Sequence, residues 1–171
     1  MVLGELLPFN YRTRQLGEWV DVDLESSIGD DVVVLFGLPG AFTPTCSNHQ
    51  LPDYDLLFSE FVSAGVGKIF CTSVNDPFVM NAWFEGQQVS NVIPLPDGNG
   101  LLAAQLGMLV DKGNLNFGLR SWRYAVVYCG KTKTVLQEFV EEGFSDNADT
   151  DPYEKSDPKT VLTWCKENLP G

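Results

Sequence analysis

Residues 31–46 read Asp-Val-Val-Val-Leu-Phe-Gly-Leu-Pro-Gly-Ala-Phe-Thr-Pro-Thr-Cys. The run from Asp31 to Gly37 is β-branched and apolar, which is typical of a strand buried on both faces. Such a strand forms the centre of an α/β sheet. Two prolines stiffen the loop that follows, and a helical pattern begins near Pro44. Cys46 therefore lies in the first turn of a helix that follows a central strand.

The segments on either side predict the other elements of the sheet. Asn10–Asp23 alternates polar and apolar residues around a Leu-Gly pair, which predicts a β-hairpin. The helix around Cys46 extends to about Ala64, and Pro52 should kink it near its middle. The remaining expected elements are, in chain order, a buried strand over 68–74, a helix over 76–87, a strand over 92–95, a helix over 101–106, strands over 124–130 and 134–140, and a helix over 157–169.

This order of elements indicates an α/β fold of the thioredoxin-like class. We expect a mixed central sheet, parallel in its early strands and antiparallel in its late hairpin, flanked by helices and preceded by the N-terminal β-hairpin. The sequence contains neither an internal repeat nor a Gly/Ser-rich linker. Residues 1–171 are therefore expected to form a single domain.

Composition excludes several classes of function. The longest apolar run, Val32–Leu38, is far shorter than the roughly 18 residues that span a bilayer, which argues against a membrane protein. The N-terminal residues show no targeting pattern, so we expect a soluble, cytoplasmic protein. A net charge of −12 argues against nucleic acid as a partner. The acidic residues concentrated after residue 137 are interpreted as a solvated surface.

The chain has four cysteines, Cys46, Cys71, Cys129 and Cys165, and one histidine, His49. Their spacing forms no CxxC pair and no metal-ligand cluster, so we expect neither a zinc site nor another metal. The thiols are expected to be reduced, without a disulfide framework. A thiol at a helix N-terminus ionises readily, because unpaired N–H groups and the helix dipole favour an anion. From position alone, Cys46 is either a reactive thiol or a buried structural one.

The segment from Pro39 to Cys46 reads P-G-A-F-T-P-T-C and matches the pattern P-x-x-x-T-x-x-C. It resembles the motif of the peroxiredoxins, and of their Prx5 or type II subfamily in particular. Further stretches resemble that subfamily in the same order: FGLP at 36–39, CTSVNDPFVM at 71–80, NAW at 81–83, PDGNG at 96–100 and RSWRY at 120–124. The resemblance extends from about residue 9 to residue 142 and does not include the tail.

The resemblance implies a thiol-dependent peroxidase acting on hydrogen peroxide and alkyl hydroperoxides. Cys46 would be the peroxidatic cysteine, which becomes a sulfenic acid. The Thr43 hydroxyl would donate to the thiolate or accept from the peroxide, and Pro39 would shield the pocket from water. Arg123 would supply the cation that favours the thiolate. Arg120 is the second arginine of the same segment. Peroxide reduction by a cysteine thiolate needs neither a metal nor an organic cofactor.

Each of these side chains has a structural explanation when it is taken alone. Thr43 could cap a helix, Pro39 could stiffen a turn, and Arg123 could pair with a surface carboxylate. The resemblance to the family rests on the occurrence of all these residues together, in the same order along the chain. The subfamily usually has a histidine four residues after the cysteine, but Gln50 occupies that position here. His49 lies on nearly the same helical side as Cys46, and we leave it outside the catalytic set because an exposed bystander explains it equally well.

The cysteine that restores Cys46 is not fixed by the sequence. Cys71 matches the second cysteine of plant type II peroxiredoxins, yet it falls in an expected buried strand, as does Cys129. Cys165, on the last helix, could be exposed and is the other candidate resolving cysteine. The favoured mechanism uses Cys46 alone, with glutathione and glutaredoxin, or thioredoxin, as the reductant.

Two further expectations follow from the resemblance. We expect a homodimer near the active site, in which an exposed aromatic surface of Phe42, Phe78, Phe117 and Trp122 takes part. The alternative to a peroxidase is a redox-sensing protein in which oxidation of Cys46 is a signal and not a turnover. A plain thioredoxin-like oxidoreductase is disfavoured because the chain has no CxxC pair, and a Cys-His hydrolase because no third orienting residue is evident.

Overall fold

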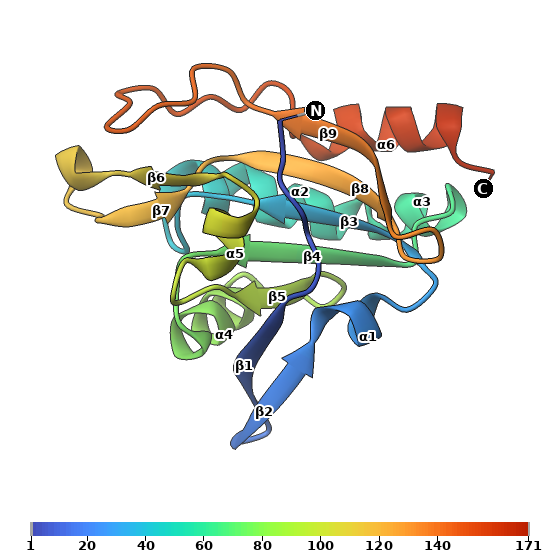
Figure 1. The fold of residues 1–171 in the computed structure, drawn as a ribbon, viewed down its shortest axis with the longest axis horizontal. Coiled ribbons are helices and arrows are strands. Elements are labelled where there is room, and N and C mark those ends of the chain that lie inside the picture. The colour runs from blue at the N-terminus through green and yellow to red at the C-terminus, as the bar shows by residue number, and fades with distance from the viewer. Residues whose placement is uncertain (1, 171) are drawn as a thin grey trace.

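A five-stranded mixed sheet forms the centre of the computed structural model, which describes residues 2–170 (Figure 1). The three early strands are parallel, whereas the last two form an antiparallel hairpin. This confirms the expected mixed sheet. In spatial order the strands are β5 (Ile93–Pro96), β4 (Lys68–Ser73), β3 (Val32–Gly37), β8 (Tyr124–Cys129) and β9 (Thr134–Val140).

Helices cover both faces of this sheet because alternate residues of β3 point to opposite sides. Val34 and Phe36 pack on one face, and Val33 and Leu35 pack on the other. The helices that cover the first face are α2 (Leu51–Leu56), α3 (Phe58–Ser63), α4 (Pro77–Gly86) and α6 (Pro158–Asn168). The second face is covered by the N-terminal segment, α1 (Leu24–Ile28) and α5 (Leu101–Gln105) (Figure 1).

Local signals in the sequence fix several of these elements. The expected N-terminal hairpin forms from β1 (Asn10–Gln15) and β2 (Glu18–Asp23), which pair antiparallel. The Asp76 carboxylate accepts the Val79 N–H at 2.9 Å and begins α4, and Asp157 caps α6 in the same way. Each cap satisfies an otherwise unpaired N–H group of the first turn, which confirms these helix starts.

The helix that carries Cys46 differs from the expected single kinked helix. Residues Cys46–Gln50 form a wide π-helical turn, in which the Leu51 N–H donates to the Cys46 carbonyl, and α2 begins directly after it. Pro52 lies in the first turn of α2, where its missing N–H is tolerated. The chain breaks between α2 and α3 at Leu57 and not at Pro52. The prediction of one continuous helix to about Ala64 is therefore wrong, and the irregular π-helical turn lies directly before Pro52.

A small ribbon between α5 and β8 was not expected from the sequence. It consists of β6 (Leu109–Asp111) and β7 (Leu119–Ser121), joined by the 3-10 turn η2 (Gly113–Leu115). Strands of three residues are too short to produce a periodic pattern. In Figure 1 the ribbon projects at the left of the sheet, beside the loop that follows β9. Within residues 2–170, no helix combines the length and apolar character needed to cross a membrane.

Candidate active site

Cys46 lies at the start of the π-helical turn, just beyond the carboxyl end of β3. Its side chain is completely buried and belongs to the same apolar cluster as Phe36. The helical segment begins as the Ser47 N–H donates to the Thr43 carbonyl at 2.9 Å. The predicted position of Cys46 in a first helical turn is confirmed. A thiol there lies next to the unpaired N–H groups of that turn.

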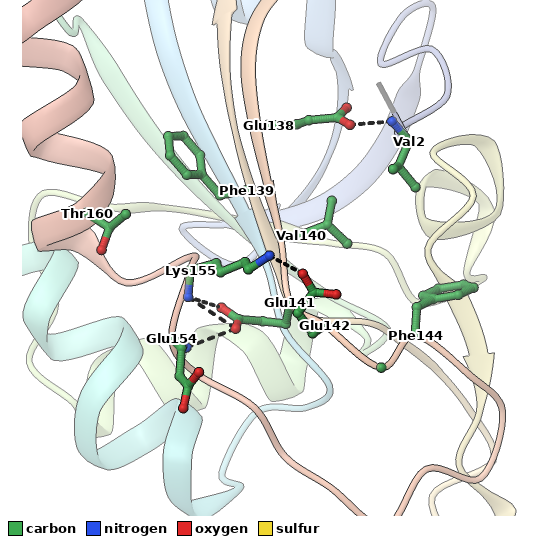
Figure 2. A pocket seen from close by; sticks show the side chains of 11 residues that line it. Val2, Glu138, Phe139, Val140, Glu141, Glu142, Phe144, Glu154, Lys155 and Thr160 are labelled. Atoms are coloured by element: carbon green, nitrogen blue, oxygen red, sulfur yellow. Dashed lines mark hydrogen bonds and ion pairs between the residues drawn. The ribbon is translucent and has the colours of Figure 1, made fainter.

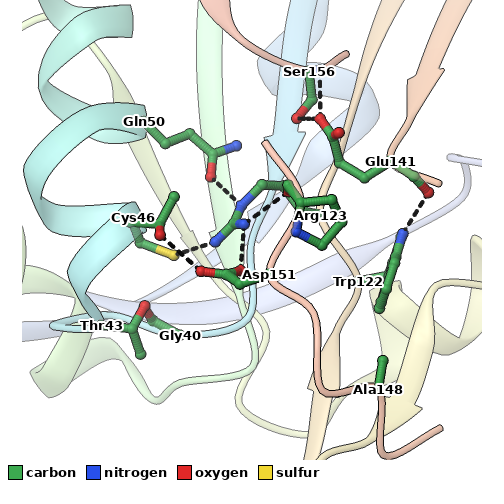
Figure 3. A network of polar contacts seen from close by, with 12 residues as sticks. Gly40, Thr43, Cys46, Gln50, Trp122, Arg123, Glu141, Ala148, Asp151 and Ser156 are labelled. Atoms are coloured by element: carbon green, nitrogen blue, oxygen red, sulfur yellow. Dashed lines mark hydrogen bonds and ion pairs between the residues drawn. The ribbon is translucent and has the colours of Figure 1, made fainter. Parts of the chain in front are cut away.

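The Arg123 guanidinium lies against this thiol (Figure 3). Its Nη2 is 3.3 Å from Cys46 Sγ, and Arg123 is only 2% exposed. Burial opposes the charge of Arg123, but Cys46 and Asp151 outweigh it and raise the pKa of Arg123 above its ordinary value. The arginine therefore stays charged beside the sulfur, where a cation stabilises a thiolate.

Arg120 occupies a different place. Its Nη1 donates to the Pro39 carbonyl at 3.2 Å, and its Nε donates to the Phe117 carbonyl at 3.1 Å. The first bond attaches β7 to the loop before Cys46, and the second holds the Arg120 side chain against the turn that precedes β7. Of the two arginines in this segment, Arg123 has the contact with the sulfur and Arg120 holds the loop.

Thr43 and Pro39 lie in the loop that leads to Cys46. The Thr43 hydroxyl donates to the Gly40 carbonyl at 2.7 Å, which leaves its oxygen lone pairs free to accept. Of the two roles expected for this hydroxyl, the geometry fits an acceptor from the peroxide and not a donor to the thiolate. Pro39 is partly buried and lines a cavity of about 10 Å³ beside Arg123, the size of one water molecule.

Gln50 also holds the Arg123 side chain in position. Its Oε1 accepts the Arg123 Nε hydrogen at 2.9 Å, and the residue is fully buried. His49, one position earlier, is exposed. The sequence showed the replacement of the usual histidine by Gln50 but not this contact, because the contact joins residues 73 positions apart.

The sequence allowed Arg123 to pair with a surface carboxylate, and the structure shows that this partner is Asp151 of the acidic tail. The Asp151 carboxylate lies 2.5 Å from Arg123 Nη1, and its second oxygen accepts the Thr45 hydroxyl at 2.7 Å. The Pro152 carbonyl accepts from the same Nη1 at 3.0 Å, and the Tyr153 ring lies 5.7 Å from the guanidinium carbon. Figure 3 shows Asp151 reaching Arg123 from the side opposite Gln50. At this position the tail is part of the site and not only a solvated surface.

Residues 142–157, here called the strap, are held in place by Glu141 at their base (Figure 2). The buried Glu141 carboxylate accepts the backbone N–H groups of Glu154, Lys155 and Ser156. Burial alone would raise the pKa of Glu141, but these bonds and the bond from the Ser156 hydroxyl lower it below its ordinary value. The other end of the strap is attached to the ribbon.

Contacts with Asp111 attach that end of the strap. The Asp146 carboxylate accepts the Asp111 N–H at 2.8 Å, and the Asn147 N–H donates to the Asp111 carbonyl at 2.7 Å. Tyr54, from α2, donates its hydroxyl to the Ser156 carbonyl at 2.6 Å. The strap is thus bonded to three separate parts of the domain, which fixes the position of Asp151 between them.

The other three cysteines match the expectations at Cys71 and differ from them at Cys165 and Cys129. Cys71, in β4, is fully buried, and burial followed by the nearby Cys46 raises its pKa. Cys165 is also fully buried, and burial raises its pKa to about 11. Cys129, which was expected in the core, is half-buried at the end of β8, where hydrogen bonds from Thr132 lower its pKa. Cys165 is therefore not exposed, which was the possibility that the sequence left open, and the predicted burial of Cys129 is wrong.

The aromatic surface also needs one correction. Phe42 and Phe78 are exposed and Phe117 is half-buried, but Trp122 is buried and donates its indole N–H to the Glu141 carbonyl at 2.8 Å. Trp122 is therefore not part of a surface. Among the residues described, no three His, Cys, Asp or Glu side chains gather in a way that could hold a metal ion.

Known proteins are similar to this chain in both sequence and fold. Residues 13–153 match the Redoxin family. A peroxiredoxin of Rhizobium etli is 50% identical over 148 residues, covering 86% of this chain and 82% of that protein. The hybrid peroxiredoxin hyPrx5 of Haemophilus influenzae is 45% identical over 162 residues, covering 94% of this chain and 65% of that protein.

Solved structures agree with these relatives. Reduced Prx3 of Vibrio vulnificus, solved in complex with hydrogen peroxide, superposes with a TM-score of 0.83 at 33% identity. The match covers 94% of this chain and 96% of that one. The chain belongs to the Redoxin family and, within it, to the peroxiredoxins of the Prx5-like group.

Proposed function

We propose that Cys46 performs the thiol peroxidase reaction of this peroxiredoxin on hydrogen peroxide and alkyl hydroperoxides. The observation that carries this proposal is the 3.3 Å contact between Arg123 Nη2 and Cys46 Sγ in a buried setting. Electrostatic stabilisation is strongest where water is excluded. The guanidinium favours the thiolate before the reaction and the negative oxygen that leaves during it.

The reaction begins as the Cys46 thiolate attacks one peroxide oxygen. A sulfur–oxygen bond forms as the O–O bond breaks, and the departing oxygen takes a proton to leave as water or an alcohol. The sulfur loses two electrons and becomes a sulfenic acid, while the peroxide is reduced. The backbone N–H groups of Thr45 and Cys46 and the guanidinium of Arg123 surround the oxygens, and Thr43 Oγ1 accepts the peroxide hydrogen.

Regeneration uses an external thiol in this proposal. A glutathione thiolate attacks the Cys46 sulfenic acid, a disulfide forms and water leaves. Glutaredoxin or a second glutathione then releases the Cys46 thiol, and thioredoxin is the alternative reductant. The burial of Cys71 and Cys165, which raises both pKa values, supports this route because a protonated, buried thiol is a poor nucleophile.

We also propose a homodimer that forms on the side of Phe42 and Phe78. Both rings are exposed. The Ala41 N–H donates to Asn75 Oδ1 at 3.0 Å, which holds the loop of Phe42 close to the start of α4, where Phe78 lies. Exposed aromatic residues on one side of a domain are typical of an interface.

Peroxide turnover by cysteine variants tests the reaction and the reductant together. Cys71→Ser and Cys165→Ser are each supplied with glutathione and glutaredoxin, and separately with thioredoxin. Both should turn over like the unmodified protein with glutaredoxin, whereas Cys46→Ser should be inactive. Activity in Cys46→Ser would overturn the assignment. Loss of activity in either of the other two, with the fold intact, would identify a resolving cysteine instead.

The same assay separates a peroxidase from a redox sensor. With excess reductant, an enzyme consumes many peroxide molecules per Cys46. Oxidation of Cys46 that stops after one equivalent, in the presence of every reductant supplied, would indicate a redox-sensing protein.

A further inference from the structure

The Asp151 carboxylate contacts both Thr45, which precedes Cys46 in the chain, and Arg123, which contacts the Cys46 sulfur. One of its oxygens is 2.5 Å from Arg123 Nη1, and the other accepts the Thr45 hydroxyl at 2.7 Å. Arg123 is almost completely buried, whereas the Asp151 side chain is 55% exposed. Asp151 therefore lies between the Arg123 guanidinium, which contacts the sulfur, and the solvent (Figure 3).

The position of Asp151 is set by the rest of the strap and not by this ion pair alone. Glu141 accepts three backbone N–H groups just after it, and Asp146 and Asn147 are bonded to Asp111 just before it. The next residue, Pro152, also accepts from Arg123 Nη1 at 3.0 Å. A carboxylate held on both sides in this way keeps its charge at a fixed point of the site.

One guanidinium therefore serves two negative groups, the Cys46 thiolate and the Asp151 carboxylate. The three groups together carry a net charge of minus one when the thiol is ionised. A neutral peroxide meets no net repulsion from this arrangement, but an anionic one must approach a second fixed negative charge. The whole chain adds to this effect, because its net charge is −12.

We propose that Asp151 makes the Cys46 pocket selective for uncharged hydroperoxides and against anionic ones. Hydrogen peroxide and uncharged alkyl hydroperoxides belong to the favoured class, and short hydroperoxy carboxylates, which carry a permanent negative charge at neutral pH, belong to the disfavoured one. This inference rests on the proposed function of Cys46 and adds the substrate class. Asp151 acts through Arg123 and through its own charge, and it takes no part in bond making.

A pair of alkylating reagents of nearly equal shape tests this selectivity. Iodoacetamide is neutral and iodoacetate is anionic, and the rate at which each modifies Cys46 is followed by mass spectrometry of its peptide. Asp151→Asn should raise the iodoacetate rate roughly fivefold more than the iodoacetamide rate, since it removes a charge next to the sulfur and keeps the shape. Added salt screens the repulsion between iodoacetate and Asp151. It should therefore raise the rate of Cys46 modification by iodoacetate less in Asp151→Asn than in the unmodified protein.

Glu154→Gln is the matched control, because it removes the same unit of charge from the strap three residues away. Glu154 bonds to Glu141 through its backbone N–H, and its side chain is exposed. The ratio of the two rates should not change in this variant. Equal acceleration of both reagents in Asp151→Asn would show that the strap only blocks access, and an unchanged ratio would show that the charge has no role. Either result overturns the inference.

Peroxide assays on the same proteins keep the two proposals apart. If the unmodified protein reduces hydrogen peroxide but the ratio of alkylation rates does not respond to Asp151→Asn, the inference fails and the proposed function stands. If hydrogen peroxide is not consumed at all, the proposed function fails whatever the alkylation shows. Asp151→Ala serves as a second variant should Asp151→Asn fold poorly.

Discussion

Arg123 is the side chain on which the site depends, because each of its three nitrogens has a separate partner. Nε donates to Gln50, Nη1 to Asp151 and Pro152, and Nη2 to the Cys46 sulfur. A planar guanidinium can make these bonds at once, whereas an ammonium group offers one compact point of charge. The charge and the geometry of this residue are therefore separate requirements.

Arg123→Lys separates these two requirements. The variant keeps a positive charge but loses the planar guanidinium that bonds to several partners at once. We therefore expect kcat/KM for hydrogen peroxide to fall roughly 100-fold. Stopped-flow measurement of peroxide reduction gives this value. Arg12→Lys, at an exposed ion pair with Asp21, is the matched control and should not change the rate. A rate for Arg123→Lys within twofold of the unmodified protein would contradict the argument.

The three remaining cysteines should differ in their reactivity in the folded protein. Cys129 is half-buried and its pKa is lowered, whereas burial raises the pKa of Cys71 and Cys165. Brief alkylation with iodoacetamide at pH 7 should therefore modify Cys129 and leave the other two intact, because the thiolate is the nucleophile. Peptide mass spectrometry measures the extent at each site, with urea-unfolded protein as the control in which all react. Faster modification of Cys165 than of Cys129 would disprove this assignment.

At the scale of elements, the helix around Cys46 and the strap together form the site. The π-helical turn at Cys46–Gln50 places Cys46 and Gln50 so that both contact Arg123. Single π-helical turns occur frequently at functional sites. The strap reaches the same arginine from the other side through Asp151 and is held by the buried Glu141.

Glu141→Gln should loosen the strap and reduce stability in a pH-dependent way. We expect a loss of about 2 kcal/mol in the free energy of unfolding at pH 7, because the charge-assisted bonds to the N–H groups become neutral ones. Since the pKa of Glu141 is lowered on folding from its ordinary value of 4.5, its contribution is complete above that value. The contribution is lost as the pH falls through the lower value of the folded protein.

Urea unfolding of both proteins at pH 7 and at progressively lower pH measures this difference, which should shrink in acid. Glu142→Gln, at the neighbouring exposed residue paired with Lys155, is the matched control and should cost less than about 0.5 kcal/mol. A difference between Glu141→Gln and the unmodified protein that stays constant at every pH would contradict the prediction.

At the scale of the whole molecule, the proposed dimer involves one end of the sheet, where the parallel strands β3 and β4 both have their carboxyl ends. Loops at the carboxyl ends of β3 and β4 carry the exposed Phe42 and the beginning of α4 with Phe78. Phe42 adopts a left-handed backbone conformation with φ of 67°, which is unusual for a large side chain. This loop, which leads to Cys46, presents the Phe42 ring to solvent.

Phe42→Asp should dissociate the dimer without unfolding the protein. Aspartate tolerates the left-handed conformation better than phenylalanine does, so the loop itself is not disturbed. Sedimentation velocity at micromolar concentration should give a dimer for the unmodified protein and a monomer for the variant. Leu136→Asp, at a partly exposed position on β9, is the control and should remain dimeric. A monomer in the unmodified protein would refute the proposed dimer.

Much of the fold was predictable because its signals are local. The apolar run before Gly37 specifies a buried strand, the residues Asp76-Pro77 and Asp157-Pro158 specify helix starts, and the alternation after residue 9 specifies a hairpin. Each depends on residues that are close in the chain. The motif that ends at Cys46, together with Arg123, was likewise sufficient to indicate the family.

Contacts between distant parts of the chain required the tertiary structure. Asp151 approaches Arg123 only because Glu141 and Asp111 fold the strap back over the site. The full burial of Cys165 and the partial burial of Cys129 depend on which helix and which strand end cover them, and a strand or helix pattern does not specify that. Local hydrogen bonding determines the elements, whereas packing between elements determines which acidic residue of the tail reaches the active site.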